Sequence, residues 1–306
     1  MRLVFAGTPD AAVPSLRALA ASGHDVVAVV TRPDAPVGRR RVLTPSPVAS
    51  AAEELGIDVI RAARLGDEAA AAITRAEPDL CVVVAYGALV REPLLSMPPH
   101  GWINLHFSLL PRWRGAAPVQ HALIAGDTVT GAAVFQLVPE LDAGDVYDEL
   151  RYPVPPSATA GEVLDALSHR GAVLLSDVVD AIGAGTARAR PQEGAPTLAP
   201  KLSAADGMLD WERPAGEVLA RFRGVTPEPG AYTTVGGARV KVLSLHRAER
   251  DIALAPGRIG ASAGSVLIGT ATNPLALGDV QPAGKSAMAA SDWWRGLRVA
   301  EPVAGR

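Results

Sequence analysis

Two polar side chains that can do chemistry close one apolar run of the sequence. Asn104 and His106 lie at the end of Trp102–His106, a run with the composition of a β-strand. Residues i and i+2 of a strand project from the same face, so the carboxamide and the imidazole would point into the same space. A polar strand end exposed to solvent explains the pair equally well, and the pair alone does not decide between the two interpretations.

The residues that follow favour a functional site. An apolar and cationic loop, 108–118, comes directly after the run, and Asp142 lies farther along the chain, in Leu141-Asp142-Ala143-Gly144-Asp145. A carboxylate beside an imidazole can orient the ring and favours its charged form. In open α/β sheets, ligands bind beyond the carboxyl ends of the strands, which is where Asn104 and His106 would lie.

The first half of the chain supplies the elements that would position these residues. Short apolar runs alternate with amphipathic stretches, which predicts a Rossmann-like, mostly parallel α/β sheet with helices on both faces. Two later strands, with an antiparallel arrangement as one option, and a long helix over 159–182 follow. The predicted strands are 3–6, 26–30, 59–60, 80–85, 102–106, 130–138 and 146–154, and the earlier helices are 14–21, 47–55, 67–76 and 117–125.

A change in composition after residue 186 indicates a second domain. Residues 1–186 are expected to form one domain, and 187–203 have the composition of a linker. Residues 204–306 contain a predicted helix, 211–223, and five short β-rich runs, which fits a smaller β-barrel with an OB-like arrangement as one option. These runs are 230–235, 239–245, 257–261, 265–269 and 274–280.

Composition excludes several classes of protein. The 306 residues are 48% hydrophobic and 20% charged, which is typical of a globular chain. The formal net charge is −3, so a surface for nucleic acid would have to be a local patch. Cys81 is the only cysteine and lies in an apolar run, so we expect a buried structural thiol, no disulfide and no metal site. A signal peptide and a membrane-length apolar run are both missing, which predicts a cytoplasmic protein without membrane contact.

The strand end and its loop also carry a more specific pattern. Asn104-x-His106-x-Ser108-Leu109-Leu110-Pro111, followed by Arg114-Gly115-x-x-Pro118 and by Asp142-x-Gly144, resembles the signature of folate-dependent formyltransferases. Further segments, in order and in spacing along almost the whole chain, are similar to the methionyl-tRNA formyltransferase family. They are 7–10, 45–48, 84–87, 115–118, 209–211, 227–231, 256–259 and 277–288.

The resemblance implies a reaction and a role for each polar side chain. The α-amine of initiator methionyl-tRNA would attack the formyl carbon of 10-formyltetrahydrofolate, the co-substrate, without a metal or a covalent intermediate. Charge builds on the carbonyl oxygen in such an attack, so donors aimed at that oxygen are the main requirement. Asn104 and His106, as an imidazolium, would be these donors. Asp142 would keep the imidazole charged and accept a proton from the amine, directly or through water.

The same resemblance implies a flat, mostly apolar cleft for the folate in a protein that we expect to be a monomer. Ser108, Leu109, Leu110 and Pro111 would line this cleft. The stretch with Tyr86, Gly87 and Leu89 offers a second wall, although an ordinary strand-to-helix turn explains these three residues equally well.

A basic, Pro/Gly-rich excursion over 31–42 is the candidate contact with tRNA. Connections in α/β units normally take about 2–6 residues, so this one is long for a structural turn. It contains Arg39, Arg40 and Arg41, which suit phosphates and base edges. A solvated charge run is the plain alternative, but the resemblance implies a loop that reaches the acceptor end of tRNA. The mildly basic part 204–306, with 12 Lys/Arg and 10 Asp/Glu, would be the tRNA-binding domain.

Three other functions fit the sequence less well. A folate-dependent formyltransferase for a small-molecule amine would share the signature, but the arginine loop and the second domain argue against it. A dinucleotide-dependent oxidoreductase would read Gly7-Thr8-Pro9-Asp10 as its fingerprint, yet no G-x-G-x-x-G follows the first strand. A tRNA-binding protein without activity would lack one of Asn104, His106 and Asp142, and all three are present.

The arginine loop leads to one testable expectation. Arg39→Ala should weaken the use of tRNA, because a phosphate or base-edge contact is lost, while any slow hydrolysis of the folate proceeds as before. Formylation rates measured against tRNA concentration check this. The same concentration dependence in the variant and in the wild-type protein would contradict a role for Arg39 in tRNA binding.

Overall fold

The computed structural model describes residues 1–38, 41–249, 252–262 and 264–305, and they form two compact units. Unit 1 consists of Met1–Pro118, Val129–Pro153 and Leu164–Pro200. Unit 2 consists of Val119–Thr128, Val154–Val163 and Lys201–Arg306. In the described part of the chain, no helix has both the length and the apolar character needed to cross a membrane.

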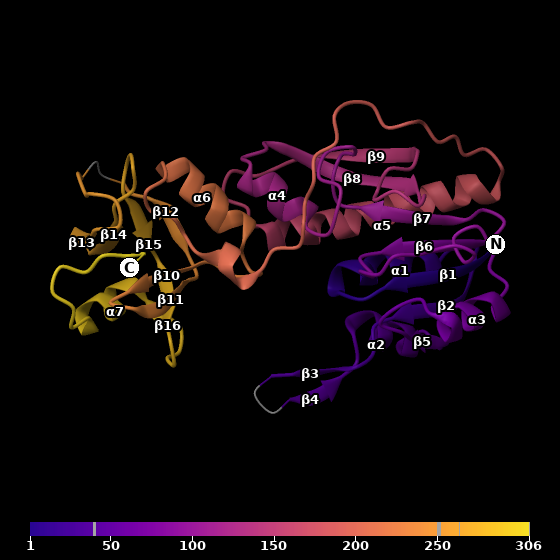
Figure 1. The fold of residues 1–306 in the computed structure, drawn as a ribbon, viewed down its shortest axis with the longest axis horizontal. Helices are drawn as coiled ribbons and strands as arrows, with labels where there is room; N and C mark the ends of the chain where they lie inside the picture. The colour runs from indigo at the N-terminus through magenta and orange to yellow at the C-terminus, as the bar shows by residue number, and fades with distance from the viewer. Residues whose placement is uncertain (39–40, 250–251, 263, 306) are drawn as a thin grey trace. The chain divides into compact units, whose positions relative to one another are not determined.

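A seven-stranded sheet forms the centre of unit 1 (Figure 1). Five neighbouring strands run parallel, and the last two join at one edge in antiparallel pairs. This arrangement confirms the predicted mostly parallel α/β sheet. In spatial order the strands are β5 (Val59–Arg61), β2 (Asp25–Thr31), β1 (Arg2–Gly7), β6 (Leu80–Val84), β7 (Trp102–His106), β8 (Val129–Gln136) and β9 (Val146–Pro153).

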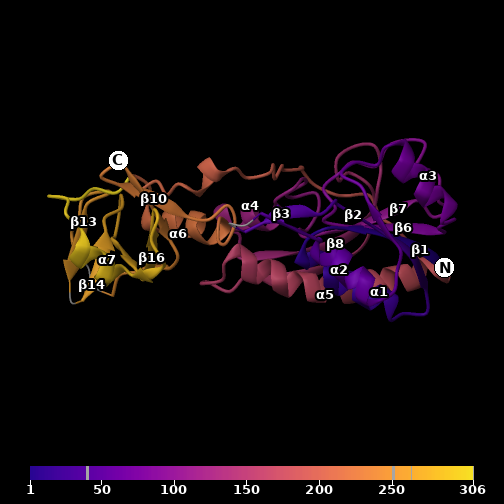
Figure 2. The ribbon, with the colours of Figure 1, turned by 90° about the horizontal axis from the view of Figure 1, so that it is seen from below.

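Helices cover both faces of this sheet, which explains why its central strands are apolar along their whole length. All five residues of β6 are buried, for example. One face carries α1, α2 and α5, and the other carries α3 (Figure 2). The Ser46 hydroxyl caps the start of α2 by accepting a hydrogen bond from the Ala49 N–H at 3.0 Å. The helices are α1 (Val13–Ala20), after the 3-10 turn η1 (Asp10–Ala12), α2 (Pro47–Glu54), α3 (Asp67–Arg75) and α5 (Ala160–Gly183).

The basic excursion after β2 is an antiparallel hairpin, although the sequence predicted only an irregular loop. Its strands are β3 (Ala35–Val37) and β4 (Val42–Thr44). At its base, Asp34 accepts a hydrogen bond from the Arg61 guanidinium at 3.0 Å. The strands are too short to show a period in the sequence, which is why the pattern did not reveal them.

Unit 2 contains antiparallel strands in two four-stranded sheets, consistent with a small barrel. Both sheets contribute to a single core, which includes Trp211, Phe222, Val240, Ile268 and Leu275. One sheet has the order β10 (Tyr232–Val235), β11 (Ala238–Val242), β16 (Asp279–Pro282) and β17 (Met288–Ala289), and the other β12 (Leu245–Arg247), β15 (Leu275–Leu277), β14 (Ser265–Ile268) and β13 (Ile259–Ser262). The helical elements are α4 (Pro118–Ile124), η2 (Ala204–Gly207), α6 (Ala215–Gly224) and α7 (Ala290–Gly296).

Two predicted strands of unit 2 are each divided between the two sheets. The run 239–245 becomes β11 and β12, and 274–280 becomes β15 and β16. The chain turns at Ser244 and Gly278, where an added Cβ on the glycine would lie 2.2 Å from the Ser244 hydroxyl. Helix α6 also begins later than the predicted 211, because Pro214 holds an extended backbone conformation just before it.

The stretch 187–203, expected to be a linker, does not behave as a free connection. Residues up to Pro200 belong to unit 1. Arg190 pairs with Val146 of β9, and Leu198 pairs with Arg114. These pairs are formed by backbone groups, which every residue type carries. The Gly-, Pro- and Ala-rich composition of 187–203 therefore gave no sign that the stretch pairs with unit 1.

Gly131 leads to a prediction about stability. A Cβ at this position of β8 would lie 2.1 Å from the Leu150 carbonyl oxygen of β9, so Gly131→Ala must push the two strands apart. We expect a loss of about 1–3 kcal/mol in the free energy of unfolding, measured with urea. Gly23→Ala is the matched control, because nothing lies within 4 Å of its added Cβ. Equal stabilities of the two variants would show that β8 and β9 do not pack this tightly.

Candidate active site

Strand β7 carries the two polar side chains with which the sequence began. Asn104 and His106 lie two residues apart on it, between β6 and β8. The intervening Leu105 faces α5, where a Cβ added to Gly171 would lie 3.0 Å from its side chain. Strand alternation therefore directs Asn104 and His106 together to the face opposite α5, and the prediction was that they share one face.

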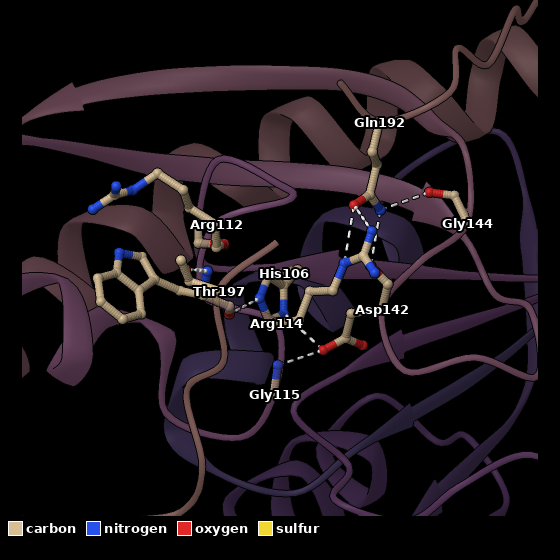
Figure 3. Close-up of polar contacts among 10 residues, drawn as sticks. His106, Arg112, Arg114, Gly115, Asp142, Gly144, Gln192 and Thr197 are labelled. Carbon is tan, nitrogen blue, oxygen red and sulfur yellow. Dashed lines mark hydrogen bonds and ion pairs between the residues drawn. The ribbon is translucent and has the colours of Figure 1, made fainter. Parts of the chain in front are cut away.

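The imidazole of His106 is almost fully enclosed, with 5% of the residue exposed. Its Nε2–H donates to the Trp113 carbonyl oxygen at 2.9 Å. Its Nδ1 lies 3.9 Å from Oδ2 of Asp142, so the structure brings these two predicted residues together (Figure 3). The ring also meets Phe135 edge to face, with 6.2 Å between the ring centroids. Of the two ring nitrogens, Nδ1 is thus the one that faces a group able to hold a proton.

Burial decides the charge of this imidazole. Desolvation lowers the pKa of His106 and outweighs the opposing effects of Asp142 and of the Trp113 carbonyl. Asp142 acts in the expected direction, because it raises the pKa of His106, but burial has the larger effect. The role of Asp142 in the reaction stays a prediction.

Asp142 is held in an unusual backbone conformation. Its φ is +47°, in the left-handed region that Asp and Asn tolerate better than most residues. Its Oδ2 accepts a hydrogen bond of 2.7 Å from the Gly115 N–H. Two residues later, Gly144 lies so close to β8 that an added Cβ would be 1.8 Å from the Gln136 carbonyl oxygen. The loop is thus fixed from both sides, and the carboxylate has little freedom to turn away from His106.

Asn104 presents a carboxamide whose oxygen is buried. Within the described ranges of the chain, this Oδ1 has no hydrogen-bond partner. A buried acceptor without a partner costs about 1–3 kcal/mol, and a bound water or a ligand group at this atom would offset that cost. The carboxamide is therefore able to bind a group that a substrate brings.

The predicted folate-binding run 108–111 is mostly internal. The Ser108 hydroxyl is fully buried and donates to the Arg112 carbonyl at 2.6 Å, which shapes the turn. Leu110 packs against Ala133 and Phe135, and Pro111 is buried. Only Leu109 is half-buried, beside Gly131. These residues form the floor of the turn around His106, and their contact with folate stays a prediction.

The second predicted wall is divided between core and surface. Tyr86 is buried in the core beside α3, and its hydroxyl donates to the Ala62 carbonyl at 2.6 Å. Gly87 is exposed, and its carbonyl accepts a hydrogen bond of 2.9 Å from Arg32. The side chain of Leu89 is 64% exposed. An apolar ligand could therefore contact Gly87 and Leu89, whereas the ring of Tyr86 supports the turn from below.

Of the three predicted tRNA contacts, only Arg41, which directly precedes β4, lies within the described residues. Arg39 and Arg40 fall outside them. Arg41 is exposed, and its N–H donates to the Gly38 carbonyl at 3.1 Å. Val42 and Leu43 follow it and are also exposed, at 60% and 67%. The side chain of Arg41 is thus presented to solvent, where a polyanion could bind it.

Two residues at the site, Gln192 and Thr197, were not anticipated. The Gln192 carboxamide bonds to Arg114 and to the loop of Asp142, and the Thr197 hydroxyl accepts a hydrogen bond from the Trp113 N–H. Both lie in the stretch interpreted as a linker. The sequence around Gln192 shows no strand or helix period, so nothing in it indicated that this side chain contacts the loops after the strands.

Cys81 plays no part in this chemistry. It is a free, buried cysteine in the middle of β6, and burial raises the pKa of its thiol. The thiol therefore stays protonated and unreactive, which confirms the prediction of a structural residue.

Models of known protein families match both parts of the chain. The formyl transferase family matches residues 1–179, and the formyl transferase C-terminal domain matches residues 201–298. The second match begins where the first unit ends in the structure, at Pro200.

Similar proteins extend over the full length of the chain. A methionyl-tRNA formyltransferase of Clavibacter sepedonicus is 63% identical over 99% of this chain and 100% of its own length. A methionyl-tRNA formyltransferase of Acidothermus cellulolyticus is 52% identical over 98% of each chain.

Solved structures with the same fold are more distant in sequence. WlaRD, a sugar 3N-formyl transferase, has a TM-score of 0.68 at 13% identity and covers 94% of this chain and 99% of its own. An N-formyltransferase from Helicobacter canadensis has a TM-score of 0.69 at 16% identity and covers 92% of this chain and 98% of its own. At this identity the likeness concerns the fold alone.

Burial of His106 predicts a specific dependence of stability on pH. Because the pKa of His106 is lowered on folding, the unfolded chain takes up a proton on this ring where the folded chain does not. The contribution of the neutral ring to the free energy of unfolding is complete above about pH 6.5, the ordinary pKa of histidine, and it is lost as the pH falls below that value. His106→Gln should therefore lose less unfolding free energy than the wild-type protein between about pH 7.5 and 5.5.

Urea unfolding at the two pH values measures this difference. If His106→Gln loses as much stability as the wild-type protein on acidification, the ring is not held neutral by burial.

Proposed function

Because this chain belongs to the methionyl-tRNA formyltransferase family of folate-dependent formyltransferases, we propose that it formylates methionyl-tRNA. In this reaction the formyl group of 10-formyltetrahydrofolate passes to the α-amino group of the initiator methionyl-tRNA, which gives N-formylmethionyl-tRNA for translation initiation. The observation that carries the proposal is the 63% identity to a methionyl-tRNA formyltransferase over 99% of this chain and 100% of that relative. The matches to both formyl transferase domains support it.

The chemistry is an attack on an amide-type carbonyl. The amine nitrogen forms a bond to the formyl carbon, the bond from that carbon to N10 of the folate breaks, and the proton that the amine loses ends on N10. We assign the Asn104 carboxamide to the tetrahedral intermediate, with its N–H groups donating to the oxyanion and its buried oxygen accepting from the amine. One such donor is worth on the order of 3 kcal/mol.

His106 would accept the proton of the attacking amine, and Asp142 would stabilise the imidazolium that results. The ring is neutral before substrates bind, and with Nε2–H bound to Trp113 its free basic atom is Nδ1. Nδ1 can take the proton of the amine as the new bond forms. The carboxylate at 3.9 Å then stabilises the imidazolium, whose Nδ1–H can donate to the oxyanion or return the proton to N10. In this assignment the imidazolium appears during the reaction, as charge develops on the substrate.

We propose that folate binds beside this end of β7. The exposed Gly87 and Leu89 and the half-buried Leu109 suit contact with a flat apolar ring, while Ser108, Leu110, Pro111 and Tyr86 hold the turns in place. An enclosed imidazole next to this surface also suits the reaction, because water is kept from the reacting carbon.

The tRNA would contact two regions. We assign Arg39, Arg40 and Arg41 to the acceptor end, on the strength of the exposed side chain of Arg41 and of the family resemblance. The mildly basic unit 2 would bind the tRNA backbone, because phosphate contacts dominate affinity for nucleic acid. Formylation of a small amine remains the second candidate, but it is supported by solved structures such as WlaRD, at 13% identity, whose likeness concerns the fold alone.

A single assay tests the proposed function. Purified protein is mixed with 10-formyltetrahydrofolate and either charged initiator or charged elongator methionyl-tRNA, and N-formylation of the methionine is measured. Formylation of the initiator tRNA is the expected result. Modification of neither tRNA would overturn the proposal, and equal use of both would remove the preference for the initiator.

The assigned roles predict the behaviour of three variants. Asn104→Ala, His106→Ala and Asp142→Ala should each lower kcat by about 100-fold or more, because an oxyanion donor or a proton carrier is lost. The affinity for tRNA, measured by filter binding, should stay nearly unchanged. Asp145→Asn provides a matched control, since Asp145 is an exposed carboxylate three residues from Asp142. Variants with wild-type kcat would refute the assignment.

A further inference from the structure

The segment 190–199, interpreted from sequence as part of a linker, contacts both loops that hold the Asp142–His106 pair. We propose that Gln192 in this segment is a positioning residue for formyl transfer: it fixes the carboxylate of Asp142 relative to the imidazole of His106 without touching a substrate. The proposal rests on the proposed function and on the roles assigned there to Asp142 and His106.

The Gln192 carboxamide uses all of its hydrogen-bonding capacity at this one place. Its Nε2 donates to the carbonyl oxygens of Asp142 and Gly144, both at 2.8 Å. Its Oε1 accepts from Nε and Nη2 of Arg114, at 3.1 and 2.6 Å (Figure 3). One planar side chain therefore connects the backbone of the Asp142 loop with the loop that follows His106.

These bonds act on the catalytic geometry through two short paths. Arg114 directly precedes Gly115, whose N–H binds the Asp142 carboxylate at 2.7 Å. Gln192 thus restrains both the donor and the acceptor side of that hydrogen bond. Because Asp142 has a φ of +47°, its loop needs fixed partners to keep a conformation that few residues adopt readily.

The same segment also restrains the imidazole. The Thr197 hydroxyl accepts a hydrogen bond of 2.9 Å from the Trp113 N–H, and the Trp113 carbonyl accepts the Nε2–H of His106. Both partners of the 3.9 Å pair are therefore held by side chains from one segment, five residues apart.

The contribution of Gln192 can be separated from simple docking of the segment. Backbone hydrogen bonds attach the segment independently: the Arg190 N–H donates to Val146, the Arg114 N–H to Thr197 and the Ala199 N–H to Arg114. Removing the carboxamide should therefore leave the segment in place and release the Asp142 loop. A displacement of about 1 Å at a reacting group can lower a rate about 100-fold.

The test uses the full-length protein and two variants of position 192. Gln192→Leu removes every hydrogen bond of the carboxamide at similar size, and Gln192→Glu keeps an acceptor for Arg114 but has no N–H for Asp142 and Gly144. We expect both to lower kcat about 10- to 100-fold, with KM for tRNA and for folate within about twofold. Glu193→Gln is the matched control, because Glu193 is the exposed neighbour in the same segment.

A pH–rate profile distinguishes positioning from general loss of structure. Asp142 raises the pKa of His106, so a displaced Asp142 should shift the acid limb of the profile to lower pH. A merely unfolded fraction would scale the profile without shifting it. The inference is overturned if both variants keep kcat within twofold of wild type, or if they lose activity only in proportion to the unfolded fraction with an unshifted profile. Wild-type protein that formylates no methionyl-tRNA would overturn the proposed function, and this inference with it.

Discussion

Taking an imidazole out of water is the constraint on which the rest of the site depends. A buried histidine keeps its neutral form unless its surroundings stabilise the charge, and here enclosure outweighs the neighbouring carboxylate. The protein nevertheless places that carboxylate within 4 Å and binds the other ring nitrogen to a carbonyl. In the proposed reaction, a charge on this ring would arise only as the amine attacks, which is the condition under which electrostatic stabilisation accelerates a chemical step.

Much of the fold could be predicted because periodicity and burial leave clear signs in sequence. The apolar run of β6 and the alternation of strands and helices indicated a parallel sheet, and Asn104 and His106 could be placed at the end of β7. The hairpin β3–β4 could not be predicted, since three-residue strands show no period. The later start of α6 was predictable in principle, because a proline such as Pro214 marks a helix start, but the predicted helix began at residue 211.

The residue types of the site could be predicted from the sequence, but the charge of His106 could not. Asp142 was chosen for its chemistry, and the structure places it beside His106. Its effect on the ring could not be ranked against burial, because desolvation depends on every atom around the imidazole. Gln192 and Thr197 were missed for a related reason: hydrogen bonds between distant loops leave no spacing rule in a single sequence.

The place of Gln192 and Thr197 in the chain has a consequence for how the protein matures on the ribosome. The last strand of the sheet ends at Pro153, and the family's first domain at 179, yet both residues come later. Domains generally fold from the N-terminus during synthesis. A nascent chain can therefore complete its sheet before Gln192 and Thr197 fix the loops around Asp142 and His106. These loops would be fixed only after residue 199 has left the exit tunnel, when residues 201–298, which match the formyl transferase C-terminal domain, begin to emerge.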